Sequence, residues 1–214
     1  ASPSTGATSS SALDLTTREL ATLSSNFSTL TVGDASNRGD VYVGGNAGGL
    51  STFTQAATVY ARNFTVVDEP AIASNYLATD FDLTVNASQT MSFTGRVALA
   101  SSRTLTLTTS SNIDQTSTAT PGESIAAQNI VATAVTGINM PWLDVTNLTV
   151  TNTGSSGNIN LGVVNLATKG VNILGVNQTG AANTAGTISV SSTLADITVK
   201  SAGTGIVGNN NINV

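Results

Sequence analysis

Apolar and polar residues alternate along this chain in short runs, and two runs far apart in the sequence share one apolar spacing. Each run has two apolar residues separated by one residue, then a polar stretch drawn mainly from Gly, Ser, Asn, Asp and Thr, then a second alternating pair. Alternation with a period of two is typical of a β-strand with one buried face. Each run therefore predicts two short strands joined by a turn. The positions that we expect to be buried are Leu30, Val32, Val41, Val43, Leu148, Val150, Ile159 and Leu161.

Looser copies of the same unit recur between these two runs and after them. A strand–turn–strand unit repeated along a chain is typical of a β-solenoid, in which each coil buries its apolar face against its neighbours. At roughly twenty residues per coil, the chain would make about ten coils. We expect a polar segment over residues 1–12 and one elongated domain over residues 13–214. A two-sheet β-sandwich is the alternative, because it also consists of alternating strands and turns.

The two ends of the expected domain differ in sequence. Near the start, Thr16 followed by Glu19 forms a capping box, which predicts a short helix over residues 17–23 that covers the open end of the stack. Leu20 and Leu23 would face inward. The last residues, NNNINV, carry no charge, proline or helical pattern. We therefore expect further coils or another copy of the chain to dock on that edge.

Composition narrows the function classes. The chain has 214 residues, 40% of them hydrophobic, but only 9% charged, with a net charge of −5. Seven scattered Lys and Arg residues cannot follow a nucleic-acid backbone, so nucleic-acid binding is not expected. No apolar run has the length needed to span a bilayer.

One stretch resembles a known family. Its pieces are an "ELxxL" start at Glu19-Leu20 with Leu23, a strand at Leu30-Thr31-Val32-Gly33, and a strand at Gly39-Asp40-Val41-Tyr42-Val43. Gly157-Asn158-Ile159-Asn160-Leu161 and Gly186-Thr187-Ile188-Ser189-Val190 repeat the last pattern. These pieces are similar to the repeats of large filamentous-haemagglutinin-type exoproteins of bacteria. The resemblance implies a right-handed parallel β-helix, export, and a place in the repetitive shaft at the cell surface.

The residues available for catalysis are few. Without histidine or cysteine, the chain can form no His-based triad, thiolate nucleophile or thiolate metal site. A carbohydrate-active β-helix enzyme would need clustered carboxylates, and the nearest clusters are Asp68-Glu69 and Asp80 with Asp82. We expect these to be solvated residues beside turns, and the protein to be neither an enzyme nor dependent on a cofactor.

Two further patterns are candidates for binding. Arg38-Gly39-Asp40 spells the integrin-recognition tripeptide and lies in an expected turn, although Gly and Asp are common in turns anyway. Asp34 and Asp40 bracket a loop rich in oxygen donors that could hold calcium, but the spacing matches no calcium motif.

Threonine and asparagine residues predict regular rows. Thr104, Thr106 and Thr108 would face outward, an arrangement that can bind ice but that β-propensity alone explains. Asparagines at turns are expected to point inward and to stack as hydrogen-bonded ladders, for example Asn165, Asn172 and Asn177.

Together, these observations predict a structural or adhesive shaft segment of a secreted or cell-surface bacterial exoprotein. Its partners would be adjoining repeats or other copies end to end, and glycans or proteins of a host cell or matrix. The alternatives are a subunit of a self-assembling extracellular filament and a carbohydrate-active β-helix enzyme.

Overall fold

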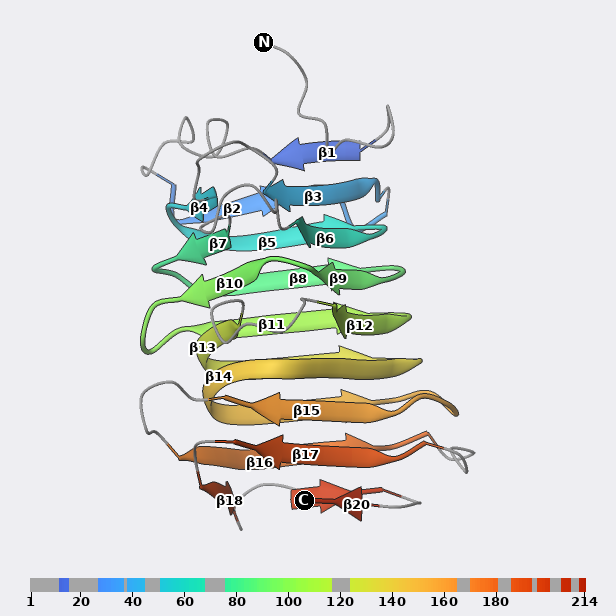
Figure 1. The fold of residues 1–214 in the computed structure, drawn as a ribbon. Coiled ribbons are helices and arrows are strands. Elements are labelled where there is room, and N and C mark those ends of the chain that lie inside the picture. Colours follow the sequence, from blue (N-terminus) through green and yellow to red (C-terminus); the bar gives the residue numbers. More distant parts are fainter. Residues whose placement is uncertain are drawn as a thin grey trace.

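The chain is a parallel β-solenoid. The computed structural model describes residues 12–15, 27–36, 38–44, 51–67, 76–116, 124–164, 170–180, 186–193, 196–200, 205–208 and 212–214. Within these ranges every regular element is a strand, and the strands coil around one axis as a right-handed β-solenoid (Figure 1). All the strand pairings in the described part of the chain are parallel, so the β-sandwich alternative, which is built from antiparallel sheets, is wrong.

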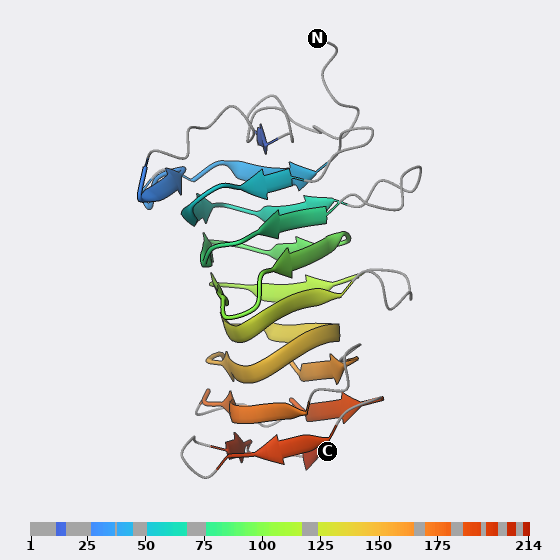
Figure 2. The same ribbon diagram turned by 90° about the vertical axis from the view of Figure 1, so that its left-hand side faces the viewer.

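Each full turn passes through three stacked sheets (Figure 2). The first sheet contains β2 (Thr29–Val32), β5 (Ala56–Ala61), β8 (Leu83–Ala87), β11 (Thr104–Thr109), the end of β13 (Ile125–Ala134), the end of β14 (Gly137–Asn152), β16 (Val171–Gln178), β18 (Ile197–Val199) and β19 (Gly205–Val207). The second contains β1 (Ala12–Leu15), β3 (Asp40–Gly44), β6 (Phe64–Val67), β9 (Met91–Phe93), β12 (Asn112–Gln115), the start of β14, β15 (Ile159–Val163), β17 (Ile188–Ser192) and β20 (Ile212–Asn213). The third contains β4 (Ser51–Phe53), β7 (Tyr76–Thr79), β10 (Arg96–Leu99), the start of β13, the middle of β14 and the end of β15.

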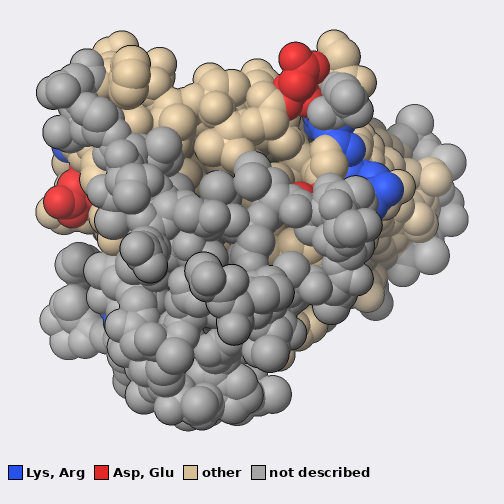
Figure 3. All heavy atoms as spheres, turned by 90° about the horizontal axis from the view of Figure 1, so that it is seen from above, with Lys and Arg blue, Asp and Glu red and all other residues tan. Residues whose placement is uncertain are grey.

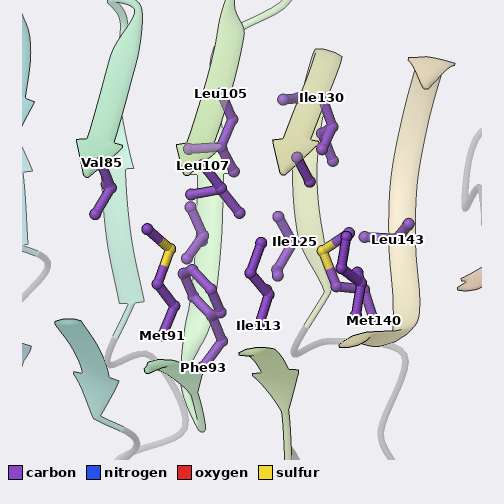
Figure 4. Packing of buried hydrophobic residues seen from close by; sticks show 14 of the residues in the cluster. Val85, Met91, Phe93, Leu105, Leu107, Ile113, Ile125, Ile130, Met140 and Leu143 are labelled. Carbon is purple, nitrogen blue, oxygen red and sulfur yellow. The ribbon is translucent and has the colours of Figure 1, made fainter. Parts of the chain in front are cut away.

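The core consists of apolar side chains that stack from turn to turn. In the first sheet, Leu105 lies in register with Leu83 on one side and with Ile130 on the other. Side chains from the other sheets fill the space between such columns (Figure 4). Of the eight positions expected to be buried, seven are buried, and Leu30 is partly buried against the same core. The alternation in the sequence therefore identifies the inward face of the strands.

The length of a turn varies, so the estimate of about ten coils, which assumed roughly twenty residues per coil, is not confirmed. Leu105 follows its stacking partner Leu83 by 22 residues, Leu148 follows Ile130 by 18, and Ile206 follows Val176 by 30. The turns differ because the loops between strands differ in length, and because β13 and β14 pass from one sheet to the next as continuous strands. The helix predicted over residues 17–23 lies outside the described residues, as do residues 1–11 of the predicted polar segment.

The segment Met140-Pro141-Trp142 is part of a strand. β14 continues through it, with a shift of register between Met140 and Leu143. Trp142 is half-buried, and its backbone N–H donates to Oε1 of Gln115 at 3.0 Å. Nε2 of Gln115 donates in return to the Trp142 carbonyl oxygen at 3.1 Å. This buried glutamine therefore satisfies the backbone groups that the register shift leaves unpaired.

Candidate functional site: a polar groove on the second sheet

Outward-facing side chains of the second sheet form two columns parallel to the solenoid axis. In β12, β14, β15 and β17 one isoleucine per strand is buried, so the residues on either side of it point outward. The strand register aligns these outward residues between successive turns. The first column is Asn112, Gly137, Asn158 and Thr187, and the second is Asp114, Asn139, Asn160 and Ser189.

Gly137 opens a hollow in the first column. It has no side chain where its neighbours carry Asn112 and Asn158, and it adopts φ +130°, which favours glycine. A Cβ at this position would lie 3.2 Å from the Asn158 carbonyl oxygen. The result is an open groove of about 500 Å³, a size usual for ligand sites, lined by Asn112, Ile113, Asp114, Thr136, Gly137, Ile138, Asn139, Asn158, Ile159, Asn160, Thr187 and Ser189.

A ladder of side-chain hydrogen bonds runs along one wall of the groove. Nδ2 of Asn160 donates to Oδ1 of Asn139 at 2.8 Å, and Nδ2 of Asn139 donates to Oδ1 of Asp114 at 2.7 Å. On the other column, Oδ1 of Asn158 accepts from the backbone N–H of Thr187 at 2.9 Å. These bonds fix the orientation of the amides, so the groove presents a preorganised polar wall.

The groove carries little charge. Among its described lining residues, Asp114 has the only ionisable side chain. An active site for glycoside hydrolysis generally requires a pair of carboxylates on either side of the scissile bond. The lining residues can instead donate and accept hydrogen bonds along the two columns of side chains.

The sequence contains a signal for this groove that its individual residues do not reveal. Four segments place an isoleucine before a polar residue: Asn-Ile-Asp at 112–114, Gly-Ile-Asn at 137–139, Asn-Ile-Asn at 158–160 and Thr-Ile-Ser at 187–189. Two of them belong to the pattern that carries the family resemblance. The signal becomes a site only when the register brings the four segments together.

The tripeptide Arg38-Gly39-Asp40 lies where β3 begins, and its aspartate is not free. Asp40 is 7% exposed, and its Oδ1 and Oδ2 accept hydrogen bonds from Nε and Nη2 of Arg62 at 2.8 and 2.6 Å. Nδ2 of Asn63 also donates to Oδ1, at 2.9 Å. The hydrogen bonds from Arg62, against the opposing effect of burial and with help from Asn63, lower the pKa of Asp40 from 3.8 to about 2. A receptor would have to displace these partners to reach the carboxylate.

Arg38 is also held by its surroundings. Its Nε donates to the Ala35 carbonyl oxygen at 3.0 Å, and its guanidinium lies 5.6 Å from the centre of the Tyr60 ring. Seen along the axis from the N-terminal end, most of the described surface in view is uncharged, and acidic and basic side chains lie at its edges (Figure 3).

The other candidate acidic residues do not converge on one site. Asp34 is exposed and accepts from the backbone N–H of Ser36, whereas the Asp40 carboxylate is bound to Arg62. Within the described ranges, no group of three acidic residues could hold a metal ion. Asp80 and Asp82 are exposed beside the bend between β7 and β8, and Asp82 accepts from the backbone N–H of Thr104 at 2.9 Å. Asp68 and Glu69 lie outside the described residues.

The predicted polar rows lie on the outer surface of the first sheet. Thr106 is in register with Thr84 of the preceding turn. Thr84 is in register with Thr58, and Thr58 with Thr31, so a column of threonines crosses several turns. Val131, 37% exposed, interrupts it in the next turn.

A second asparagine ladder lies beside this column. Nδ2 of Asn172 donates to Oδ1 of Asn147 at 2.9 Å, and Nδ2 of Asn147 donates to Oδ1 of Asn129 at 2.8 Å. The expected ladder at Asn172 is confirmed, but it faces outward from the sheet rather than inward at a turn. Asn165 lies outside the described residues.

No protein-family model, curated protein or solved structure matches this chain. In the part of the chain that the structure describes, no helix has the length and apolar character to cross a membrane.

Proposed function

We propose that this chain is a non-catalytic segment of the shaft of a secreted or cell-surface bacterial exoprotein, with a structural and adhesive role. The observation that carries the proposal is the continuity of the stack. Buried residues follow one another in register from Val32 through Val59, Val85, Leu107, Ala132 and Val150 to Val176. Such a stack transmits load along its axis through backbone hydrogen bonds at every turn.

Its dimensions also suit a shaft. At about 4.8 Å between neighbouring strands, the stacked strands of the second sheet, from β1 to β20, extend roughly 40 Å along the axis. Lateral surfaces rich in Thr, Ser and Asn hydrate the rod without the charge repulsion that a highly charged surface would bring. The resemblance to filamentous-haemagglutinin-type repeats supports the same proposal.

The non-catalytic part of the proposal is supported by the groove, because Asp114 lacks a second carboxylate among the lining residues. The partners proposed are adjoining turns of the same kind and, laterally, surface or matrix glycans and proteins.

Immunogold electron microscopy tests this function. Antibodies raised against the chain are applied to intact cells of the source and, in parallel, to permeabilised cells. Labelling of thin projections on intact cells is expected. Labelling only after permeabilisation would contradict an extracellular shaft.

A filament subunit is a second candidate, and the last turn favours it. Val199, Val207 and Ile212 are 48%, 50% and 42% exposed, and their strands pair on one side only among the described strands. Another turn, from the same chain or from a second copy, would cover these side chains. Sedimentation velocity over a range of concentrations separates the two candidates: a filament subunit forms long head-to-tail oligomers as concentration rises, and a shaft segment stays monomeric.

A further inference from the structure

The geometry points to the groove on the second sheet as a binding site for an extended, neutral, β-linked glycan. This inference rests on the proposed extracellular function, since such a location would expose the groove to polysaccharide. The juxtaposition that carries it is a straight amide-and-hydroxyl wall beside the hollow at Gly137.

The distance between successive polar side chains of the wall is close to the length of one unit of an extended sugar polymer. Asp114, Asn139, Asn160 and Ser189 present one polar side chain per strand, and neighbouring strands are about 4.8 Å apart. A pyranose unit in an extended β-linked chain advances by nearly the same step. Successive sugar units lying along the axis would therefore meet equivalent polar groups. A single compact ligand would contact only part of this row.

The wall also retains the hydrogen-bonding capacity that sugar hydroxyls require. Asn139 uses one N–H toward Asp114 and one oxygen lone pair for Asn160, which leaves one N–H and one lone pair. The ladder holds each amide plane in place, so binding costs little side-chain entropy. The hydroxyls of Thr187 and Ser189 extend the same wall.

Charge and shape select the sugar class. The Asp114 carboxylate repels uronates and sialates, and the described lining residues provide no cation to offset it. The hollow at Gly137 admits a ring where a side chain would exclude it. The lining residues include no aromatic platform, so the contact depends on hydrogen bonds and is weak for a single site.

The experiment is an NMR titration of the isotope-labelled chain. The neutral probes are the β-1,4-linked tetrasaccharides of glucose, mannose and N-acetylglucosamine at millimolar concentration, and the acidic probe is tetragalacturonate. We expect at least one neutral probe to shift backbone amide signals of the groove residues, and the acidic probe to leave them unchanged. Release of shorter sugars would contradict the non-catalytic proposal instead.

Matched variants locate the site. Asn139→Ala removes the middle of the groove ladder and should weaken binding at least tenfold. Asn147→Ala removes the middle of the ladder on the first sheet, whose residues do not line the groove, and should bind like the wild type. Ser189→Leu fills the groove and leaves the ladder intact, so it should also weaken binding at least tenfold. Circular dichroism confirms that each variant is folded.

The outcomes separate this inference from the function on which it rests. No shift with any neutral probe, shifts away from the groove, or binding as tight as the wild type by Asn139→Ala and Ser189→Leu would overturn the groove site. Surface labelling of intact cells would still stand in each of these cases, because it does not depend on the groove.

Discussion

Replacing Val150 with aspartate tests the register of the core. Val150 is fully buried and lies in register between Ala132 and Val176 of the adjoining turns. Losing the burial of a valine side chain costs about 1.5–3 kcal/mol, and a buried carboxyl without a partner adds roughly 1–3 kcal/mol even when it is protonated. The combined loss of about 2.5–6 kcal/mol is a large share of the roughly 5–15 kcal/mol by which domains are usually stable.

Thr149→Asp is the matched control. Thr149 precedes Val150 on the same strand, but it faces outward and is partly exposed, so the same carboxylate there should change stability by no more than about 0.5 kcal/mol. Urea unfolding followed by far-ultraviolet circular dichroism at pH 7 measures both variants against the wild type. Wild-type stability of Val150→Asp, or a large loss for Thr149→Asp, would refute the assignment of inward and outward faces.

Three further predictions follow from individual contacts. Gly162→Ala should lower the thermal midpoint by several degrees in a melting experiment, since its Cβ would overlap the backbone carbonyl of Pro141; an unchanged midpoint would contradict this close approach. Because the pKa of Asp40 falls from 3.8 to about 2 on folding, its stabilising effect is present above about pH 4 and is lost as the pH falls toward 2. Melting curves of Asp40→Asn should therefore depend less on pH in that window than those of the wild type, and parallel curves would contradict the ion pair with Arg62. Arg38→Ala should leave attachment of integrin-bearing cells unchanged in an adhesion assay, and a loss of attachment would show that the tripeptide is recognised despite its contacts.

The sequence predicts the local strands well because alternation is a local property. The pairs Leu30 with Val32 and Leu148 with Val150 indicate which face of each strand points inward, and the structure places them there. The number of turns could not be predicted in the same way, because the loops between strands have no fixed length.

The groove and the ion pair that holds the aspartate of Arg38-Gly39-Asp40 both depend on contacts between turns. Asp114 meets Asn139, which lies 25 residues later, and Asp40 meets Arg62, which lies 22 residues later. Neither separation can be read from a repeat whose length changes from turn to turn. Gly137 creates the hollow only because the register puts it between two residues that carry side chains.

Disulfide cross-linking tests the parallel stack most directly, and the chain has no cysteine of its own to interfere. Thr84 and Thr106 are register partners in β8 and β11, so their Cα atoms lie about 4.8 Å apart, within the range that a disulfide spans. The double variant Thr84→Cys with Thr106→Cys should form an intramolecular disulfide under mild oxidation. The pair Thr84→Cys with Thr108→Cys, displaced by two residues along the strand, should stay reduced. Efficient cross-linking of the displaced pair, with none in the registered pair, would contradict the solenoid.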